Sequence, residues 1–463
     1  MLYGCLVELD ALLSIIMIII YGLFCLRLTQ VNLSDVFLFC RIFPLLFVLG
    51  FYIDTQFDYN NVNTLMSITE FMTTIDFLLA ALLFFIMYNF QSFESILLLL
   101  FTFIAQYYML HSIDLLTFYI ALEAQNFCFL VLCGLPSIIS SSSVHSGKTS
   151  VTGHNYVFSV EASIKYFLLS AFSSGVLLFW FSAIYAETGV SILSFSPKEQ
   201  SLYTGYGLST ISIFLILCAM MFKLGAAPLH LWVVQIYNGV KRNLLLYIST
   251  APKLSLFGFW INSFQTVWTD YSVLLFSIFS IVLGAFGAYS QPTLRTLLAY
   301  STINEIGLLL SALETAGFNS LFQHLTIYII SQILLWNLYD KRLFTMLAVS
   351  LAGLPPLAGF FGKAWIFWHV SSVGAYSVLM IALFCTAVSL VYYIRIIRLF
   401  WNVNNVSDAY DTKAHKTYKF KYTTKAHNTI IHLDMTEQRV YLTSACVVLL
   451  IMLPIFVIKP FIV

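Results

Sequence analysis

Long apolar runs separated by polar connections repeat along the whole chain. A membrane-crossing helix needs about 20 apolar residues to span a hydrocarbon layer roughly 30 Å thick. The pattern therefore predicts an all-α polytopic membrane protein with about fourteen transmembrane helices. We expect these helices at residues 11–28, 35–53, 71–90, 94–111, 114–134, 161–186, 208–234, 242–263, 272–289, 294–313, 321–339, 343–370, 375–401 and 440–459.

Two polar segments interrupt this pattern. Residues 136–160 contain four consecutive serines, which predicts a flexible surface loop. Residues 402–439 contain KAHKTYKFKYTTKAH and predict a second polar loop. The expected organisation is then three N-terminal helices in residues 1–93, five helices in 94–263, five in 264–401, the polar loop in 402–439 and one helix in 440–463.

Basic residues favour one side of the predicted membrane protein. When the loops are assigned to alternate sides, sixteen of the 22 basic residues fall on one side and two on the other. Because basic loops remain on the cytoplasmic or matrix side, the 402–439 loop is predicted there and both termini on the opposite side. The eight cysteines are scattered and form no CxxC pair. We find no nucleotide-binding or haem motif either, so we expect no cofactor, metal or nucleic acid to bind this chain.

Four lysines fall inside or at the mouth of the apolar helices: Lys165, Lys223, Lys253 and Lys363. Each costs roughly 2.5–3.5 kcal/mol at a helix centre, so such residues usually face a bundle interior or a hydrated cavity. Lys165 lies about one turn from its helix start, and snorkelling to the surface is an alternative reading for it.

Carboxylates that could partner these lysines are few. Glu123 and Glu305 lie in the middle of predicted helices, whereas Asp76 lies within two turns of a helix start and could have a local or interfacial role. Burial disfavours a charged lysine and a nearby carboxylate favours it, so a buried pair can exchange a proton near neutral pH. Intramembrane acid–base chains of this kind are typical of proton pumps.

Glycine and proline interrupt two of the lysine-bearing helices. FKLGAAPLHLW contains Lys223 and Pro228, and GLPPLAGFFGK ends at Lys363. Proline removes a backbone donor, and such breaks are tolerated where protein or water satisfies the freed groups. The breaks fall in helices seven and twelve, which predicts two five-helix repeats of inverted topology. His230, just after the first break, could continue a relay or could be a packed core histidine.

Several segments occur together in the order and spacing of one known family. They are DLLTFYIALEAQNF, SIKYFLLSAFSSGVLLF, FKLGAAPLHLW, STAPKLSLF, LLAYSTINEIG and LAGLPPLAGFFGKAWIF. From about Glu94 to Trp401, the chain resembles the antiporter-like subunit 2 family of respiratory NADH:ubiquinone oxidoreductase (complex I), called subunit N in bacteria. The resemblance implies a proton relay through Glu123, Lys165, Lys223, Lys253 and Lys363, with His230 and Glu305 as further members. Glu305 is a departure, since the family usually carries histidine there, and the passage Ser311–Ser350 is shorter than usual.

The resemblance also implies partners and a location. NADH, FMN, iron–sulfur clusters and ubiquinone are expected in partner subunits, so this chain would be a non-redox subunit of the enzyme. Expected neighbours are other membrane-arm subunits, including the adjacent antiporter-like subunit, and membrane lipids. The composition, with 43 Phe against 21 Gly, suggests an AT-rich organelle genome. The expected location is therefore the mitochondrial inner membrane, with both termini facing the intermembrane space, and a plastid or bacterial membrane is the alternative. A subunit of a Na⁺/H⁺ antiporter and a purely structural scaffold are the alternatives; the scaffold predicts loss of the buried charges.

Overall fold

The computed structural model describes residues 43–45, 48, 70–87, 93–112, 114–134, 149–189, 207–263, 271–337 and 341–402. Within these ranges all regular structure is helical and no strand occurs. The helices expected at 11–28 and 440–459, most of the helix expected at 35–53, and the loop at 403–439 lie outside the described residues.

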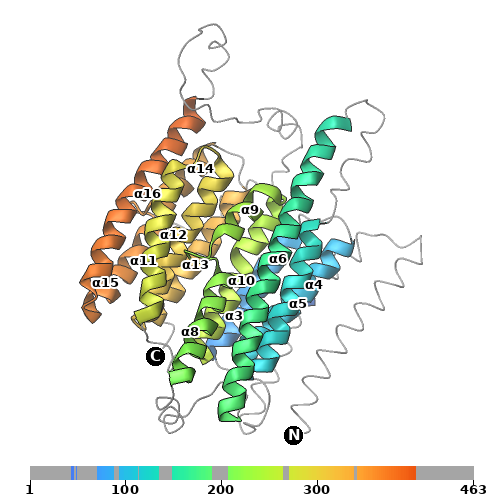
Figure 1. The fold of residues 1–463 in the computed structure, drawn as a ribbon. Coiled ribbons are helices and arrows are strands. Elements are labelled where there is room, and N and C mark those ends of the chain that lie inside the picture. Colours follow the sequence, from blue (N-terminus) through green and yellow to red (C-terminus); the bar gives the residue numbers. More distant parts are fainter. Residues whose placement is uncertain are drawn as a thin grey trace. The chain divides into compact units, whose positions relative to one another are not determined.

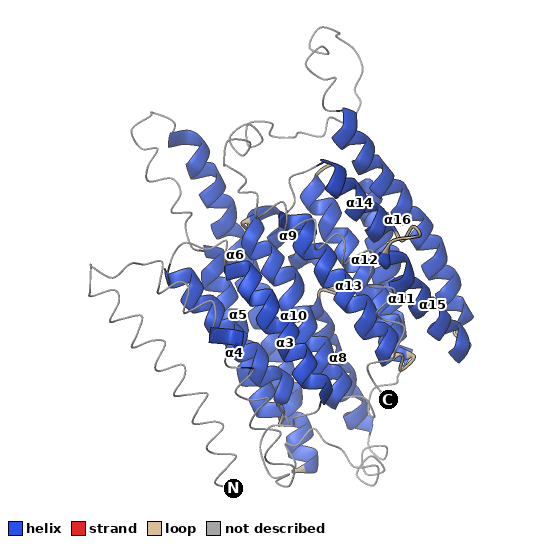
Figure 2. Cartoon of the chain, turned by 180° about the vertical axis from the view of Figure 1, so that it is seen from behind, coloured by secondary structure: helices blue, strands red, loops and turns tan. Residues whose placement is uncertain are grey.

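The described helices follow the expected apolar runs (Figures 1 and 2). Seven of them are long and apolar enough to cross a membrane, counted over the described part of the chain. An all-helical membrane fold is thereby confirmed. The bounds are α3 (Glu70–Met87), α4 (Phe93–His111), α5 (Leu115–Gly134), α6 (Thr149–Thr188), α8 (Gly207–Leu224), α9 (Leu231–Gly239), α10 (Arg242–Ser263), α11 (Tyr271–Ser290), α12 (Leu294–Glu314), α13 (Phe318–Asn337), α14 (Lys341–Ala352), α15 (Ala358–Val373) and α16 (Tyr376–Asn402).

One expectation was wrong. Residues 149–160, predicted to belong to a flexible loop, form the first turns of α6, a helix of 40 residues. The stretch is polar but contains no proline, and a helix satisfies its own backbone groups whether or not its side chains are apolar. The apolar part, Ser159–Ala186, is the candidate membrane span.

The chain divides into two compact units, and the first combines Met1–Met220 with Gly239–Val267. Its central helix is α10, which packs against α3, α4 and α5. In the apolar part of α10, 94% of residues are buried. Polar contacts reinforce this packing, because the Tyr247 hydroxyl accepts from Thr102 at 2.9 Å and donates to Gln106 at 3.0 Å.

The second unit combines Met221–Asn238 with Trp268–Val463. Its central helix is α12, which packs against α11, α13, α15 and α16 and is also 94% buried. Glycines allow α11 to approach closely: a Cβ on Gly284 would lie 2.5 Å from the Asn304 backbone nitrogen. Buried hydroxyls of α12 donate to carbonyls one turn earlier, as Ser301 does to Leu298. The small residues of α11 and the hydrogen bonds of the α12 hydroxyls to carbonyls of their own helix therefore allow this polar helix to occupy the core.

α8 ends in a tight hydrogen-bonded turn within the second unit. Gly225 adopts a left-handed backbone with φ 77°. Its N–H donates to the Phe222 carbonyl at 3.0 Å, and the Ala226 N–H donates to the Met221 carbonyl at 3.0 Å. This is the Schellman pattern, which satisfies the last carbonyls of a helix. A cis proline, Pro228, follows, and α9 begins at Leu231.

α14 ends in the same way. Gly353 has φ 82°, and its N–H donates to the Ser350 carbonyl at 3.0 Å. The Leu354 N–H donates to the Val349 carbonyl at 3.3 Å. A cis proline, Pro356, again follows three residues after the glycine. Both Gly–Pro segments predicted from sequence therefore end a helix by one local geometry, which only a residue that tolerates positive φ can adopt readily.

Candidate functional site

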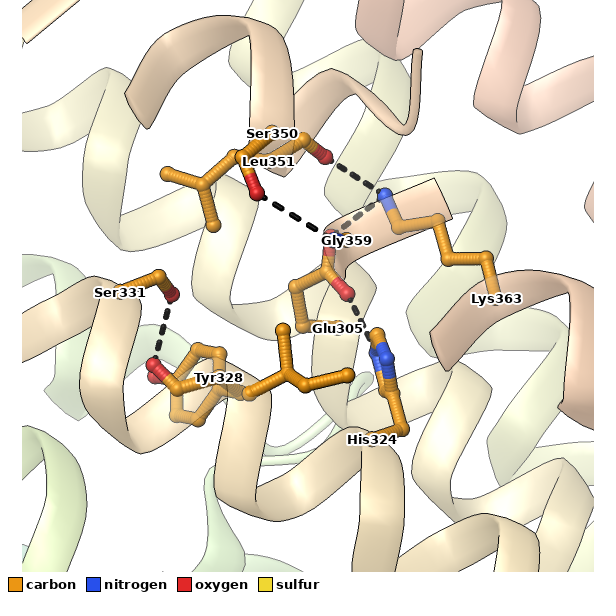
Figure 3. Close-up of a pocket in the computed structure, with 9 residues that line it drawn as sticks. Glu305, His324, Tyr328, Ser331, Ser350, Leu351, Gly359 and Lys363 are labelled. Atoms are coloured by element: carbon orange, nitrogen blue, oxygen red, sulfur yellow. Dashed lines mark hydrogen bonds and ion pairs between the residues drawn. The ribbon is translucent and has the colours of Figure 1, made fainter. Parts of the chain in front are cut away.

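Three charged or polar side chains meet in the core of the second unit (Figure 3). Glu305 projects from the middle of α12, His324 from α13 and Lys363 from α15. Glu305 Oε1 lies 2.8 Å from Lys363 Nζ, and Glu305 Oε2 lies 2.9 Å from His324 Nε2. Each side chain belongs to a residue that is at most 4% exposed. The two oxygens of one carboxylate thus bind two different nitrogen bases.

Lys363 has a second partner at the end of α14. Its Nζ donates to the Leu351 carbonyl oxygen at 2.7 Å. In a continuous helix this carbonyl would accept from the residue four positions later, but that residue is Pro355, which has no N–H. The lysine therefore satisfies a carbonyl that the helix end leaves without a donor, and the proline helps to create the lysine's binding site.

The end of α14 and the start of α15 are locked together beside this contact. The Gly359 N–H donates to Ser350 Oγ at 3.2 Å. A Cβ on Gly359 would collide with the Ser350 carbonyl oxygen. Glycine is thus required for the approach of the two helices, and this approach positions Lys363 over Glu305.

A small cavity adjoins the three side chains (Figure 3). Its volume is about 10 Å³, close to the least that holds one water molecule. Its lining includes Tyr328, Ser331, Ser350 and Leu351 as well as the three residues above. One water molecule there would have several polar partners, which such a site requires.

The contacts of His324 indicate its protonation state. Nδ1 is buried and has no hydrogen-bond partner among the described residues. A Cβ on Gly362 would lie 2.7 Å from this nitrogen, so α15 covers it closely. A proton on Nδ1 would leave a buried donor unsatisfied, whereas an unprotonated Nδ1 is only an unused acceptor. We therefore assign the neutral tautomer with the proton on Nε2, which gives the three groups a net charge of zero.

A line of tyrosines leads from this cluster to α9. Tyr328 lies one turn after His324 on α13 and lines the cavity. Its side chain interacts with that of Tyr237 on α9. Tyr237 also packs edge-on against Trp336, with ring centroids 6.1 Å apart. Two neighbouring tyrosine side chains thus lie between α9 and the cavity.

Two predicted site residues flank the first helix end. Lys223, half-buried, lies in the last turn of α8. His230 lies just before α9 and is 8% exposed. The His230 ring contacts Tyr300 of α12 with centroids 5.7 Å apart, and its Nδ1 has no hydrogen-bond partner in the described ranges. Tyr300 precedes Glu305 on the same helix by five residues, which is about 7.5 Å along the axis.

The remaining predicted residues lie in the first unit. Glu123 of α5 accepts a hydrogen bond from Asn126 Nδ2 at 3.1 Å, and Asn126 Oδ1 accepts from Tyr166 at 3.0 Å. Lys253 is 6% exposed in the middle of α10. Lys165 forms an ion pair with Glu161 one turn earlier on α6, and both side chains are about half exposed. The structure therefore buries Lys253 deeply and leaves Lys165 at the surface of this chain.

Sequence reasoning missed two histidines. His324 was not considered, although it pairs with Glu305, and His111 was not considered, although it lies 2.7 Å from Asp76. Each is a single histidine in an apolar helix, and neither has an acidic residue one helical turn away within its own helix. The sequence therefore gives no signal for either pair. Over the described ranges, no group of three or more His, Cys, Asp and Glu side chains could hold a metal ion.

Comparison with known sequences assigns the family. The family described as NADH:quinone oxidoreductase/Mrp antiporter matches residues 112–342. NADH-ubiquinone oxidoreductase chain 2 of Chlamydomonas reinhardtii is 46% identical over 457 residues, which cover 99% of this chain and 100% of the relative. The chain belongs to the chain 2 family. Chain 2 of Marchantia polymorpha is 31% identical over 350 residues, covering 67% of this chain and 68% of the relative.

A bacterial relative and two solved structures extend the comparison. NADH-quinone oxidoreductase subunit N of Hirschia baltica is 30% identical, covering 68% of this chain and 69% of the relative. A chain of respiratory complex I from Thermus thermophilus has a TM-score of 0.69 at 22% identity, covering 95% of this chain and 98% of that one. A chain of the Mrp complex from Dietzia has a TM-score of 0.64 at 17% identity, covering 86% of this chain and 79% of that one. The two structural likenesses show the shared fold.

Proposed function

We propose that this chain is a proton-translocating membrane-arm subunit of NADH:ubiquinone oxidoreductase. The observation that carries the proposal is the buried cluster of Glu305, Lys363 and His324 in a member of the chain 2 family. Ionisable residues inside membrane helices are unfavourable and usually functional. Electron transfer would take place in partner subunits that hold NADH, FMN, iron–sulfur clusters and ubiquinone.

The cluster can move a proton without creating net charge. The Lys363 ammonium breaks an N–H bond and Glu305 Oε1 forms an O–H bond, so an ion pair becomes two neutral groups. Throughout, the His324 Nε2–H can donate to Glu305 Oε2. Net charge in a poorly solvated interior is highly unfavourable. A proton transfer that keeps the pair neutral overall therefore costs less free energy than a step that leaves either group charged alone. The reverse step reloads Lys363.

The second unit offers a route to this exchange. Lys223 would receive a proton near the end of α8, and His230 would pass it toward α12 through the region beside Tyr300. The tyrosines Tyr237 and Tyr328 would offer a second approach to the cavity. Lys363 would then deliver the proton toward the opposite membrane face or the next subunit. In this scheme Glu305 is a working member of the relay that takes the place of the usual histidine.

Glu123, Lys165 and Lys253 would serve the first unit. Lys253, buried in α10, would carry a proton within that unit, and Glu123 would modulate Lys223 electrostatically. The surface position of Lys165 supports a role where protons enter or where a neighbouring subunit packs.

The proposal extends to topology and location. The two similar helix ends after Leu224 and Ala352 support α8–α9 and α14–α15 as the broken helices seven and twelve of two inverted repeats. We place the protein in the mitochondrial inner membrane, with both termini facing the intermembrane space. Its neighbours would be other membrane-arm subunits, including the adjacent antiporter-like subunit, and membrane lipids.

The antiporter alternative has weaker support. Its links to this chain are the family description shared by NADH:quinone oxidoreductases and Mrp antiporters and the fold shared with the Mrp complex at 17% identity. Neither separates the two functions, whereas the chain 2 relative is 46% identical over 99% of this chain. Copurification separates the two functions: we expect this chain to purify with NADH-dependent quinone reduction. Purification with Na⁺/H⁺ exchange and no quinone reduction would overturn our proposal.

The decisive experiment is Lys223→Ala in the assembled complex reconstituted into vesicles. We expect quinone-coupled proton pumping to be abolished or sharply reduced while the complex still assembles. The matched control is Lys241→Ala, which removes a lysine between α9 and α10 and should leave pumping near wild type. Full pumping by the assembled Lys223→Ala complex would contradict the central role of this residue.

A further inference from the structure

A second buried acid–base pair lies in the first unit and contains no residue of the proposed relay. Asp76 of α3 and His111 at the end of α4 are 4% and 1% exposed. Asp76 Oδ2 lies 2.7 Å from His111 Nε2. The Tyr107 ring packs on the imidazole with centroids 4.5 Å apart. Asp76 Oδ1 is buried and has no hydrogen-bond partner among the described residues, so the carboxylate keeps one oxygen able to accept a proton.

The helix packing brings this pair to the level of Gly258 on α10. Ile75 and Leu110, the neighbours of Asp76 and His111 in sequence, both approach this glycine. A Cβ on Gly258 would lie 2.7 Å from Ile75 Cδ1 and 2.7 Å from Leu110 Cδ1. Lys253 precedes Gly258 by five residues, which is about 7.5 Å along the helix axis. The acid–base pair therefore lies on helices that pack against the helix of the buried lysine, about a turn and a half from its level.

Stability alone does not account for the pair. Replacing a buried ion pair by apolar groups of similar volume is often neutral or stabilising, because removing two charges from water outweighs their attraction. The surrounding helices are apolar, and leucine or phenylalanine could fill the same space. An acid and a base at hydrogen-bonding distance inside membrane helices instead suit the binding of a proton.

We propose that Asp76 and His111 form a second proton-binding site, loaded and unloaded in step with Lys253. When the site is loaded, the pair holds a proton as carboxylate and imidazolium, with a net charge of zero. Loss of the imidazolium proton leaves carboxylate and neutral imidazole, with a charge of −1. A protonated Lys253 on the adjoining helix α10 favours this charge and an unprotonated one does not, so gain of a proton by the lysine favours release by the pair.

The helices that carry the pair, and those near them, hold other titratable groups. They are Tyr107 and Tyr108 on α4, Tyr247 and Lys253 on α10, and Asp114 and Glu123 just before and within α5. Among these described groups Lys253 is the cation, which makes it the charge expected to control the site. The inference rests on the proposed proton-translocating function.

The test compares Asp76→Asn with Thr102→Val in the assembled complex. Asparagine keeps a carbonyl acceptor for His111 but lacks the negative charge that stabilises the imidazolium, whereas Thr102→Val removes a buried hydrogen bond of α4 without removing a titratable group. Two quantities are measured: protons pumped per electron pair, and the protonated-carboxyl and imidazole bands in the infrared difference spectrum between oxidised and NADH-reduced complex. We expect Asp76→Asn to lower the proton ratio and remove a carboxyl or imidazole band, and Thr102→Val to change neither.

The outcomes separate this site from the proposed function. If Lys223→Ala stops pumping while assembled Asp76→Asn keeps the wild-type ratio and all its bands, the function stands and the second site is refuted. If Asp76→Asn prevents assembly, the exchanged pair Asp76→His with His111→Asp decides: recovered pumping supports the site, and an assembled complex without recovery overturns it. A wild-type spectrum without any carboxyl or imidazole response overturns it regardless of the variants.

Discussion

The ammonium group of Lys363 lies 2.7 Å from the carbonyl oxygen of Leu351. That oxygen lacks a helical donor because the chain leaves the helix at Gly353 and because Pro355, four residues after Leu351, has no N–H. The same ammonium group is 2.8 Å from Glu305. One lysine thus joins an otherwise unsatisfied carbonyl at the end of α14 to a buried carboxylate, and its position depends in part on Pro355, which carries no charge.

Pro355→Ala tests this dependence. The substitution supplies a backbone N–H that can compete with Lys363 for the Leu351 carbonyl, and a hydrogen bond to a charged group contributes roughly 1.5–3 kcal/mol. We expect the assembled complex to pump roughly tenfold more slowly, since that is the effect of 1.4 kcal/mol on a rate. Proton uptake by reconstituted vesicles measures this, with Leu354→Ala as the control that leaves proline in place. Equal pumping by wild type and Pro355→Ala would show that the lysine is held by other contacts.

Lys363 and Glu305 should be energetically coupled. Lys363→Met leaves a buried carboxylate without its cation, and breaking such a pair destabilises by roughly 3–5 kcal/mol. Adding Glu305→Gln removes the uncompensated charge, so we expect the double variant to be more thermostable than Lys363→Met alone but still unable to pump normally. Thermal inactivation of the assembled complex and vesicle pumping measure the two effects. Additive losses of stability would argue against direct coupling.

His324 can be tested for its role beside Glu305. His324→Gln retains an N–H donor for the carboxylate but cannot titrate, whereas His324→Leu removes the donor. We expect His324→Gln to keep most of the pumping and His324→Leu to lose it, because the assigned tautomer makes His324 a fixed donor that positions Glu305. Proton pumping by both variants in reconstituted vesicles, measured at several pH values, distinguishes the two roles. Loss of pumping in both variants at every pH would show that the histidine itself carries the proton.

Gly359 should tolerate no side chain. Its Cβ would meet a backbone oxygen of Ser350, which cannot move aside as a flexible side chain could. We expect Gly359→Ala to destabilise the subunit by roughly 1–3 kcal/mol through overpacking and to displace Lys363. Gly175 of α6 is the matched control, since a Cβ there meets nothing within 4 Å. Thermal inactivation of Gly359→Ala and Gly175→Ala, measured side by side, checks the prediction. Equal stability of the two variants would mean that α14 and α15 can move apart without cost.

The helices and the intramembrane charges could be predicted from sequence because both depend on local composition. A charge within an apolar run is costly wherever its partner lies, so Lys363 and Glu305 were recognised singly. Their pairing could not be predicted, because it depends on how α12, α13 and α15 pack. His324 gave no signal, since it is an isolated histidine in a passage that departs from the family. The relay roles of these residues remain predictions.

A local pattern misled in one place. The polar run before Glu161 predicts a loop, although polarity does not prevent a helix that continues from an apolar one. For Lys165 the sequence leaves an intramembrane role and snorkelling open. The structure adds an ion pair with Glu161 at the spacing of one helical turn, and the relay role of Lys165 stays a prediction.

The short separation within the Lys363–Glu305 pair has a consequence for how the membrane potential can act. The two atoms are 2.8 Å apart, at most about a tenth of a hydrocarbon layer roughly 30 Å thick. Moving a full charge across the whole layer changes its energy by about 2.3 kcal/mol per 100 mV. If the proton moves as proposed, the field changes the energy of this step by at most about 0.2 kcal/mol per 100 mV. The membrane potential must then act mainly on the steps in which protons enter and leave the subunit.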